Sequence, residues 1–155
     1  MQGARDDSDT LGGIVLPAGD VNLLLPNSAV AEIITYRRPD PVKSTFAWLL
    51  GIIDWRDNLV PVISLAADQG GKAREELGRR ACFVVCYLPS GNPELPYVAV
   101  LASAAPRLVR FRAIDIKPAS AALTNPFVLH SLSYDSQPAL IPNMDAIERA
   151  VLAAQ

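Results

Sequence analysis

The chain has 155 residues, half of them apolar, and carries 14 basic and 16 acidic side chains for a formal net charge of −2. This length allows one domain with a sizeable core, or two small lobes that share one. No basic run exceeds two residues and no apolar run approaches the roughly 20 residues of a membrane span, so we expect neither nucleic-acid binding nor membrane insertion.

The N-terminal part combines an acidic segment with a predicted hairpin. Residues 1–11 are charged or small and have little to bury, so we expect them to be disordered. They contain no apolar signal sequence, which favours a cytoplasmic protein. Order is expected from Gly12 onward. The apolar runs Ile14–Leu16 and Val21–Leu25 flank turn-forming residues and predict two antiparallel strands.

A short helix is predicted next. Ser28 can serve as its N-cap, and Val30, Ile33 and Ile34 recur on one helical face. The two prolines that follow Arg38 end this helix, because a proline disfavours helical geometry in the residue before it.

The clearest pattern in the chain is the segment 51–65, which predicts two apolar strands joined by a tight turn at Asp57 and Asn58. β-Branched and aromatic residues dominate both flanks. Pro61 lacks an N–H group, so the second strand is expected at a sheet edge or a bulge. Arg56 lies at the rim of the hairpin, where its guanidinium can point outward to a carboxylate, although an ordinary surface arginine has the same sequence pattern.

The second half of the chain repeats the alternation of strands and turns. Residues 66–80 are polar and glycine-rich, and we interpret them as a solvated linker. After the linker, strands are predicted at Cys82–Leu88, Tyr97–Leu101, Leu108–Phe111, Ile114–Ile116, Phe127–Tyr134 and Ala139–Ile141. The last element is a helix over residues 143–154, with Asn143 as its N-cap and one apolar stripe.

The two cysteines, Cys82 and Cys86, lie four residues apart in a predicted strand. They therefore share a face, but their separation of roughly 13 Å is too long for a disulfide. Both are expected to be buried and reduced. No metal site and no cofactor are predicted, because the one histidine, His130, is remote from the cysteines in sequence.

The two halves of the chain echo each other. Residues 25–34 align with residues 100–109, and in both segments a strand runs into a serine-containing stretch of small residues that ends in two aliphatic side chains. Trp55 and its hairpin align in the same way with Tyr134 and its hairpin. This repetition predicts two similar small β-barrels, since closed barrels also remove exposed strand edges.

Nothing in the sequence predicts catalysis. The nucleophile-elbow, phosphate-binding and zinc-protease motifs do not occur. His130 lies in an apolar stretch without an identifiable partner, which is typical of a core or rim histidine. A small-ligand binding lobe or a hydrolase that uses His130 and neighbouring acids is the alternative.

The central hairpin also carries a family resemblance. The segment Gly51–Arg56 (GIIDWR), followed by Leu59–Ile63 (LVPVI), resembles the signature of CheW-like domains, the coupling proteins of bacterial chemosensory systems. Upstream, Leu24–Pro26 and Val30–Ile34 resemble the strand-and-turn motif that precedes it in the family. The resemblance extends from about residue 21 to residue 151.

The resemblance implies a mainly β fold of two five-stranded SH3-like barrels packed together, with short helices and a C-terminal helix. A single domain over residues 12–155 would then divide into lobe one at about 20–66, a linker at about 67–80, lobe two at about 81–142 and the helix at 143–154.

The resemblance also implies a non-enzymatic adaptor recruited to membrane-associated receptor arrays. It would bind the cytoplasmic tip of a chemoreceptor (a methyl-accepting protein) on one surface and the regulatory domain of a CheA-like histidine kinase on another. Partner contact is implied for Val30, Glu32, Gly51, Arg56 and Asp57. Val30 and the missing side chain of Gly51 would leave an apolar groove for a receptor helix, and Glu32 and Arg56 would fix its register by charge.

The sequence departs from the family pattern at several positions. Asp57 replaces the usual glycine after Arg56, Ser64 replaces the usual aspartate, and residues 102–105 differ from the usual sequence of the second half. These departures indicate a divergent coupling protein, similar to the ChpC-type members of type IV pilus chemosensory systems. They also leave open an array scaffold that binds the receptor but not the kinase.

Overall fold

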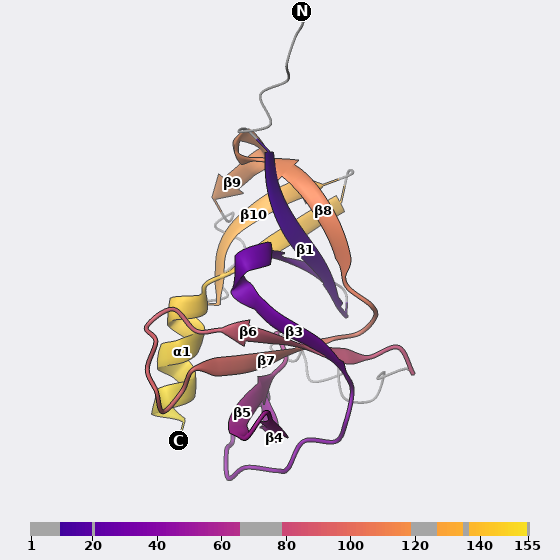
Figure 1. The fold of residues 1–155 in the computed structure, drawn as a ribbon. Coiled ribbons are helices and arrows are strands. Elements are labelled where there is room, and N and C mark those ends of the chain that lie inside the picture. The colour runs from indigo at the N-terminus through magenta and orange to yellow at the C-terminus, as the bar shows by residue number, and fades with distance from the viewer. Residues whose placement is uncertain (1–9, 20, 66–78, 119–126, 135–136, 155) are drawn as a thin grey trace, which may run out of the picture.

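The computed structural model of the chain describes residues 10–19, 21–65, 79–118, 127–134 and 137–154, which are mainly β (Figure 1). The strands are β1 (Thr10–Ala18), β2 (Val21–Pro26), β3 (Val30–Thr35), β4 (Leu49–Trp55), β5 (Asn58–Ile63), β6 (Cys82–Tyr87), β7 (Tyr97–Ala102), β8 (Arg107–Arg112), β9 (Ile116–Pro118), β10 (Val128–Tyr134) and β11 (Gln137–Pro142). The helices are α1 (Met144–Ala153) and the 3₁₀ turns η2 (Asn27–Ala29) and η5 (Ala113–Asp115).

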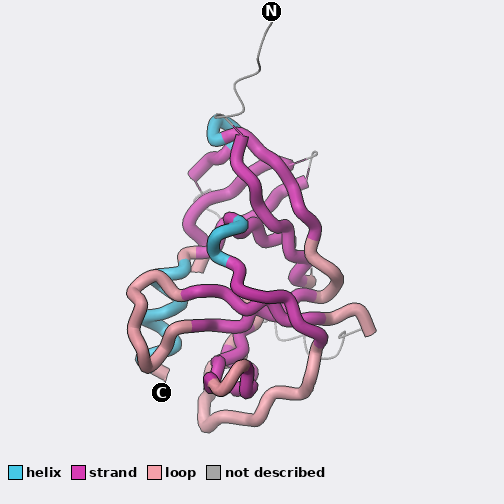
Figure 2. Tube along the Cα trace, in the orientation of Figure 1, coloured by secondary structure: helices cyan, strands magenta, loops and turns pink. Residues whose placement is uncertain are grey.

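The strands form two sheets, which lie one above the other in Figure 1. The six-stranded sheet has the order β8-β1-β2-β11-β10-β9, and the five-stranded sheet has the order β3-β6-β7-β5-β4. The pairs β2 with β11 and β5 with β7 are parallel, and the other pairs are antiparallel. Figure 2 shows the α-helix at the side of the five-stranded sheet. The predicted mainly β architecture of two lobes is therefore confirmed, with the short β9 as a sixth strand in one lobe.

Three clusters of buried side chains hold this architecture together. The largest lies between the sheets, includes Leu16, Leu23 and Val84, and receives Ile147 and Val151 from α1. Each sheet also curls around a smaller cluster of its own. The five-stranded sheet encloses Ile53, Trp55, Val60, Val62, Phe83, Val85, Ala99 and Leu101, and the six-stranded sheet encloses Val15, Leu24, Val109, Phe111, Leu132 and Ala139.

The apolar run of β6 follows from burial on both of its faces. Phe83 and Val85 point into the five-stranded barrel, whereas Cys82, Val84 and Cys86 belong to the cluster between the sheets. The two cysteines thus share a face and are buried free thiols, as predicted. Burial raises the pKa of the Cys86 thiol to about 12, and it also raises the pKa of Cys82.

Each sheet is assembled from both halves of the chain. The hairpin of β1 and β2 belongs to the six-stranded sheet, whereas the next three strands, β3 to β5, belong to the five-stranded sheet. In the second half the hairpin of β6 and β7 joins β3 to β5, and β8 to β11 return to the six-stranded sheet. The orders β8-β1-β2-β11-β10 and β3-β6-β7-β5-β4 are therefore equivalent, and the two halves of the chain have exchanged their hairpins.

This exchange differs from the predicted lobe boundaries. A lobe over residues 20–66 groups β2 with β3 to β5, and a lobe over residues 81–142 groups β6 and β7 with β8 to β11, but the hydrogen-bonded sheets group them otherwise. The echo between residues 25–34 and 100–109 fits the exchange, since both segments leave a hairpin and enter the opposite sheet. Local sequence patterns identify strands, whereas long-range packing decides which sheet each strand joins.

Two local predictions are wrong. Residues 30–34 lie in β3 instead of a helix, because pairing with β6 puts Val30 against the cluster between the sheets and Ile34 against the barrel cluster. Pro61 is not on an edge strand, because β5 lies between β4 and β7. Pairing of β5 with β7 is confined to Val62 and Ile63, so the missing N–H of Pro61 falls just outside it.

The two ends of the chain agree with the predictions in part. β1 begins at Thr10, so Thr10 and Leu11, which were expected to be disordered, belong to a strand. Residues 1–9 and residues 67–78 of the predicted linker lie outside the described residues. The C-terminal helix is confirmed, with the side chain of Asn143 accepting a hydrogen bond from the N–H of Ala146 at 3.1 Å.

Candidate partner-binding surface

The turn between β4 and β5 consists of Arg56 and Asp57. Trp55 pairs with Asn58 across the hairpin, and the two turn residues have φ angles of 49° and 63°. Positive φ at both central residues is the mark of a type I′ turn, whose twist matches that of the flanking strands. The side-chain amide of Asn58 donates to the carbonyl oxygen of Arg56 at 3.0 Å. The predicted turn at Asp57 and Asn58 is thus wrong by one residue, and Arg56 is part of the turn itself.

Glu32, Trp55 and Arg56 form a cluster, which we call the Glu32–Trp55–Arg56 cluster. The indole N–H of Trp55 donates to Oε2 of Glu32 at 2.5 Å, and Nη2 of Arg56 lies 3.2 Å from Oε1 of the same carboxylate. The guanidinium carbon of Arg56 lies 5.0 Å from the centroid of the Trp55 ring, within range of a cation–π contact. One carboxylate therefore holds both the ring and the cation.

Exposure differs sharply within this cluster. Trp55 is buried and belongs to the core of the five-stranded barrel. The side chain of Arg56 is 69% exposed and that of Glu32 is 36% exposed. An ion pair this exposed contributes little to stability, typically about 0.2–1 kcal/mol. The guanidinium of Arg56 is thus held in place and exposed to solvent, although its ion pair with Glu32 adds little to the stability of the fold.

Two tyrosines extend the cluster along the same end of the barrel. The ring of Tyr97 meets Trp55 edge to face, with centroids 4.9 Å apart, and the ring of Tyr87 lies 5.6 Å from that of Tyr97. Tyr87 is 51% exposed, and Leu59 next to the turn is 72% exposed. Aromatic rings, an arginine and exposed apolar groups together are typical of a protein-binding surface.

The cluster also closes the barrel. β3 and β4 are the outer strands of the five-stranded sheet, and the bond between Trp55 and Glu32 joins them. Nη2 of Arg37 donates to the carbonyl oxygen of Asp54 in the same way. Asp40 and Ile52 exchange two backbone hydrogen bonds of 2.8 and 2.9 Å. The surface therefore rests on a closed and rigid scaffold.

Gly51 does not leave the open groove that the sequence suggested. A Cβ atom at this position would lie 2.3 Å from the carbonyl oxygen of Asp40, and the φ of Gly51 is +150°, which strains any other residue. The missing side chain makes room for the chain's own loop, so Gly51 has a structural role. Val30 packs against the cluster between the sheets, away from the ring of Trp55.

Of the five predicted contact residues, the structure brings Glu32 and Arg56 into contact. Asp57 is exposed beside Arg56 in the turn, and its carboxylate forms no ion pair within the described residues. Trp55 and Tyr97 were not among the predicted contact residues. The indole N–H of a buried tryptophan needs an acceptor, and this requirement was the signal that could have linked Trp55 to a carboxylate.

His130 is the residue on which the alternative hypothesis depends. It lies on β10, and its Nδ1 atom is buried without a hydrogen-bond partner in the part of the chain that the structure describes. The described residues also contain no group of three or more histidine, cysteine, aspartate or glutamate side chains that could hold a metal. No helix among them is long and apolar enough to cross a membrane. The alternative of a small-ligand binding lobe or a hydrolase that uses His130 stays a hypothesis, since its neighbouring acid Asp135 lies outside the described residues.

Comparison with known proteins agrees with the fold described above. Residues 12–151 match the family model of the CheW-like domain. No curated protein matches the chain. Among solved structures, the chain is similar to the crystal structure of the scaffolding protein TtCheW from Thermoanaerobacter tengcongensis, with a TM-score of 0.74 and 15% sequence identity over 93% of this chain and 91% of that one. The two sheets described above are thus the two SH3-like lobes of that fold.

Proposed function

The chain belongs to the CheW-like domain family, and on this premise we propose that it is a non-enzymatic chemosensory adaptor that couples receptor tips to a CheA-like histidine kinase. The observation that carries this proposal is the Glu32–Trp55–Arg56 cluster, with its exposed cation above a buried aromatic ring. Arginine and tryptophan are the residues that most often dominate binding energy in protein interfaces.

Arg56 is well suited to be the central contact. It belongs to a two-residue turn, and both Glu32 and the Trp55 ring restrict its side chain before any partner arrives. Because its freedom is already reduced, binding a partner carboxylate costs less side-chain entropy. Exposed ion pairs exchange partners readily, so a carboxylate of the receptor or kinase can compete with Glu32. We expect a transient contact of modest affinity.

The test is a binding titration of the full chain with each partner separately. One partner is a soluble receptor fragment that contains the cytoplasmic tip, and the other is the regulatory domain of the cognate kinase. Arg56→Ala should weaken binding of at least one partner by about tenfold or more. Arg149→Ala, which removes the same charge from an exposed position on α1, should change both affinities by less than about twofold. Absence of binding to both partners would refute the adaptor.

The same titrations separate the second candidate, an array scaffold without kinase binding. The similar TtCheW structure is described as that of a scaffolding protein, which keeps this candidate in view. Binding of the receptor fragment together with no detectable binding of the kinase domain would favour the scaffold. Binding of both would favour the coupling role.

A further inference from the structure

β8 carries three of the chain's 14 basic residues within six positions. Arg107, Arg110 and Arg112 are all exposed, and none of them forms an ion pair with a carboxylate among the described residues. Asp115 in η5, close to β8 in sequence, forms none there either. Such a local charge on a chain of net charge −2 favours an acidic partner.

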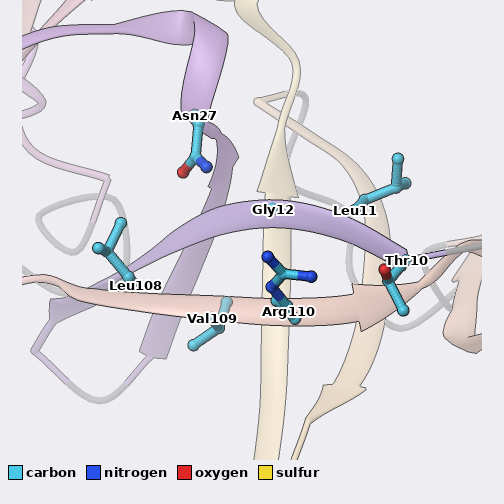
Figure 3. A pocket seen from close by; sticks show the side chains of 7 residues that line it. All are labelled: Thr10, Leu11, Gly12, Asn27, Leu108, Val109 and Arg110. Carbon is cyan, nitrogen blue, oxygen red and sulfur yellow. The ribbon is translucent and has the colours of Figure 1, made fainter. Parts of the chain in front are cut away.

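A groove of about 620 Å³ runs over β8 and β1 (Figure 3). Arg110 pairs with Gly12 in the ladder, and Figure 3 shows the side chains of Arg110 and Asn27 pointing towards Gly12 from opposite sides. A Cβ atom on Gly12 would lie 2.6 Å from Nδ2 of Asn27, so a side chain at this position would displace the Asn27 amide. Leu11 and Leu108 are 44% and 79% exposed. The groove therefore combines a cation and an amide with two exposed apolar side chains.

Among the described strands, β8 is also an edge of its sheet. Its one pairing partner is β1, and within the described residues no backbone hydrogen bond from outside the sheet reaches residues 107–112. The equivalent edge strand β3 in the other sheet is instead joined to β4 through Glu32 and Trp55. An unpaired edge of this kind can accept an additional strand from another chain.

We infer that β8 binds an extended acidic segment of a partner protein, which adds as a further strand along the free edge of β8 and contacts the exposed side chains of Leu108 and Arg110 at the border of the groove. Side chains alternate along a strand, so the exposed face of the new strand meets Leu108, Arg110 and Arg112 in turn. In the partner strand, two acidic residues at alternate positions face Arg112 and Arg110, and an apolar residue two positions further on faces Leu108. The residue between the two acidic ones is apolar. This site goes beyond the proposed adaptor contact, because it lies on the other sheet from the Glu32–Trp55–Arg56 cluster.

The test uses the full chain and a fluorescein-labelled peptide that contains the sequence Glu-Val-Glu-Val-Leu. Fluorescence anisotropy should detect binding that weakens with added salt, and a peptide with lysine in place of glutamate should not bind. Arg110→Glu should weaken binding by about tenfold or more, and the neutral Arg110→Gln by less. Arg149→Glu makes the same charge change on α1 and should alter affinity by less than about twofold.

Amide NMR spectra locate the bound peptide and confirm that each variant is folded. The expected shifts fall on residues 107–112 and on the paired residues of β1. Equal losses for Arg110→Glu and Arg149→Glu would mean a response to net charge alone and would overturn the site. Shifts confined to the Glu32–Trp55–Arg56 cluster would also overturn it. If the free chain self-associates and Arg110→Glu makes it monomeric in sedimentation, β8 pairs with a second copy and the inference of a different partner fails.

Discussion

Replacing Gly51 with alanine should destabilise the chain through its own loop and not through a lost partner. The new Cβ atom would lie 2.3 Å from the carbonyl oxygen of Asp40, so the loop must move. That movement threatens the two backbone hydrogen bonds between Asp40 and Ile52, each with a net contribution of about 1 kcal/mol. The φ of +150° adds strain of about 1–3 kcal/mol for a residue with a side chain.

Together these terms predict a loss of roughly 3–5 kcal/mol in the free energy of unfolding. This is a large part of the 5–15 kcal/mol that is typical of a whole domain. For a chain of this size it corresponds to a fall in Tm of roughly 6–20 °C. Urea unfolding followed by circular dichroism measures the change directly, provided that the slope against urea concentration stays constant.

Gly91→Ala is the matched control. Gly91 also has a positive φ, of 68°, but a Cβ atom there would meet nothing within 4 Å. Its replacement should therefore cost only the backbone strain, about 1 kcal/mol. Equal costs at the two glycines would show that the close approach of Asp40 does not hold the barrel. An unchanged stability of Gly51→Ala with a lost receptor contact would instead return Gly51 to the binding role that the sequence suggested.

Three further changes test other contacts. Burial raises the pKa of Cys86 from 9.0 to about 12, so above pH 9 the thiol ionises in the unfolded chain but not in the folded chain. The free energy of unfolding should therefore fall by up to about 1.4 kcal/mol per pH unit between about pH 9 and pH 12. The reference is Cys86→Ser, measured in the same reducing buffer. A parallel pH dependence of the two proteins would contradict this. Asn143→Ala removes the N-cap of α1 and should lower the free energy of unfolding, measured by thermal unfolding, by about 1 kcal/mol. Asn143→Asp keeps a capping oxygen and should lower it little. Equal losses would mean that the side chain does not cap the helix. Trp55→Phe removes the hydrogen-bond donor to Glu32 and should lower the free energy of unfolding by about 1.5–3 kcal/mol. Glu32→Gln keeps an acceptor oxygen and should lower it less. The opposite order in urea unfolding would refute the hydrogen bond.

The elements that could be predicted from the sequence are those encoded by nearby residues. The hairpin of β4 and β5 and the helix α1 are encoded by β-branched flanks and by a capping residue within a few positions. β3 was misassigned because Val30, Ile33 and Ile34 fit a helical spacing as well as they fit a partly buried strand. Pairing with β6, which is distant in sequence, decides between them. The exchange of hairpins was not predicted for the same reason, since it also depends on pairing between strands that are distant in sequence.

The candidate site was predicted in outline but not in its geometry. Glu32 and Arg56 do meet, yet the turn was placed one residue late because a non-glycine residue at positive φ is uncommon and Asn58 seemed the better candidate than Arg56. The role of Gly51 depends on Asp40, which reaches it through a loop. The local sequence around Gly51 does not indicate that the carbonyl oxygen of Asp40 packs against it.

The exchange of hairpins also decides how the molecule can come apart. A cut between β5 and β6 leaves one fragment with the hairpin of β1 and β2 but without its four partner strands, and with β3 to β5 but without the hairpin that joins them. Neither fragment holds a complete sheet, so we expect the two fragments to complement each other and to fold together when they are mixed. The cluster between the sheets, which contains Leu16 and Val84, also joins the two lobes through a shared core. A ligand that holds either surface therefore stabilises the whole chain, by the mass-action term of its own binding.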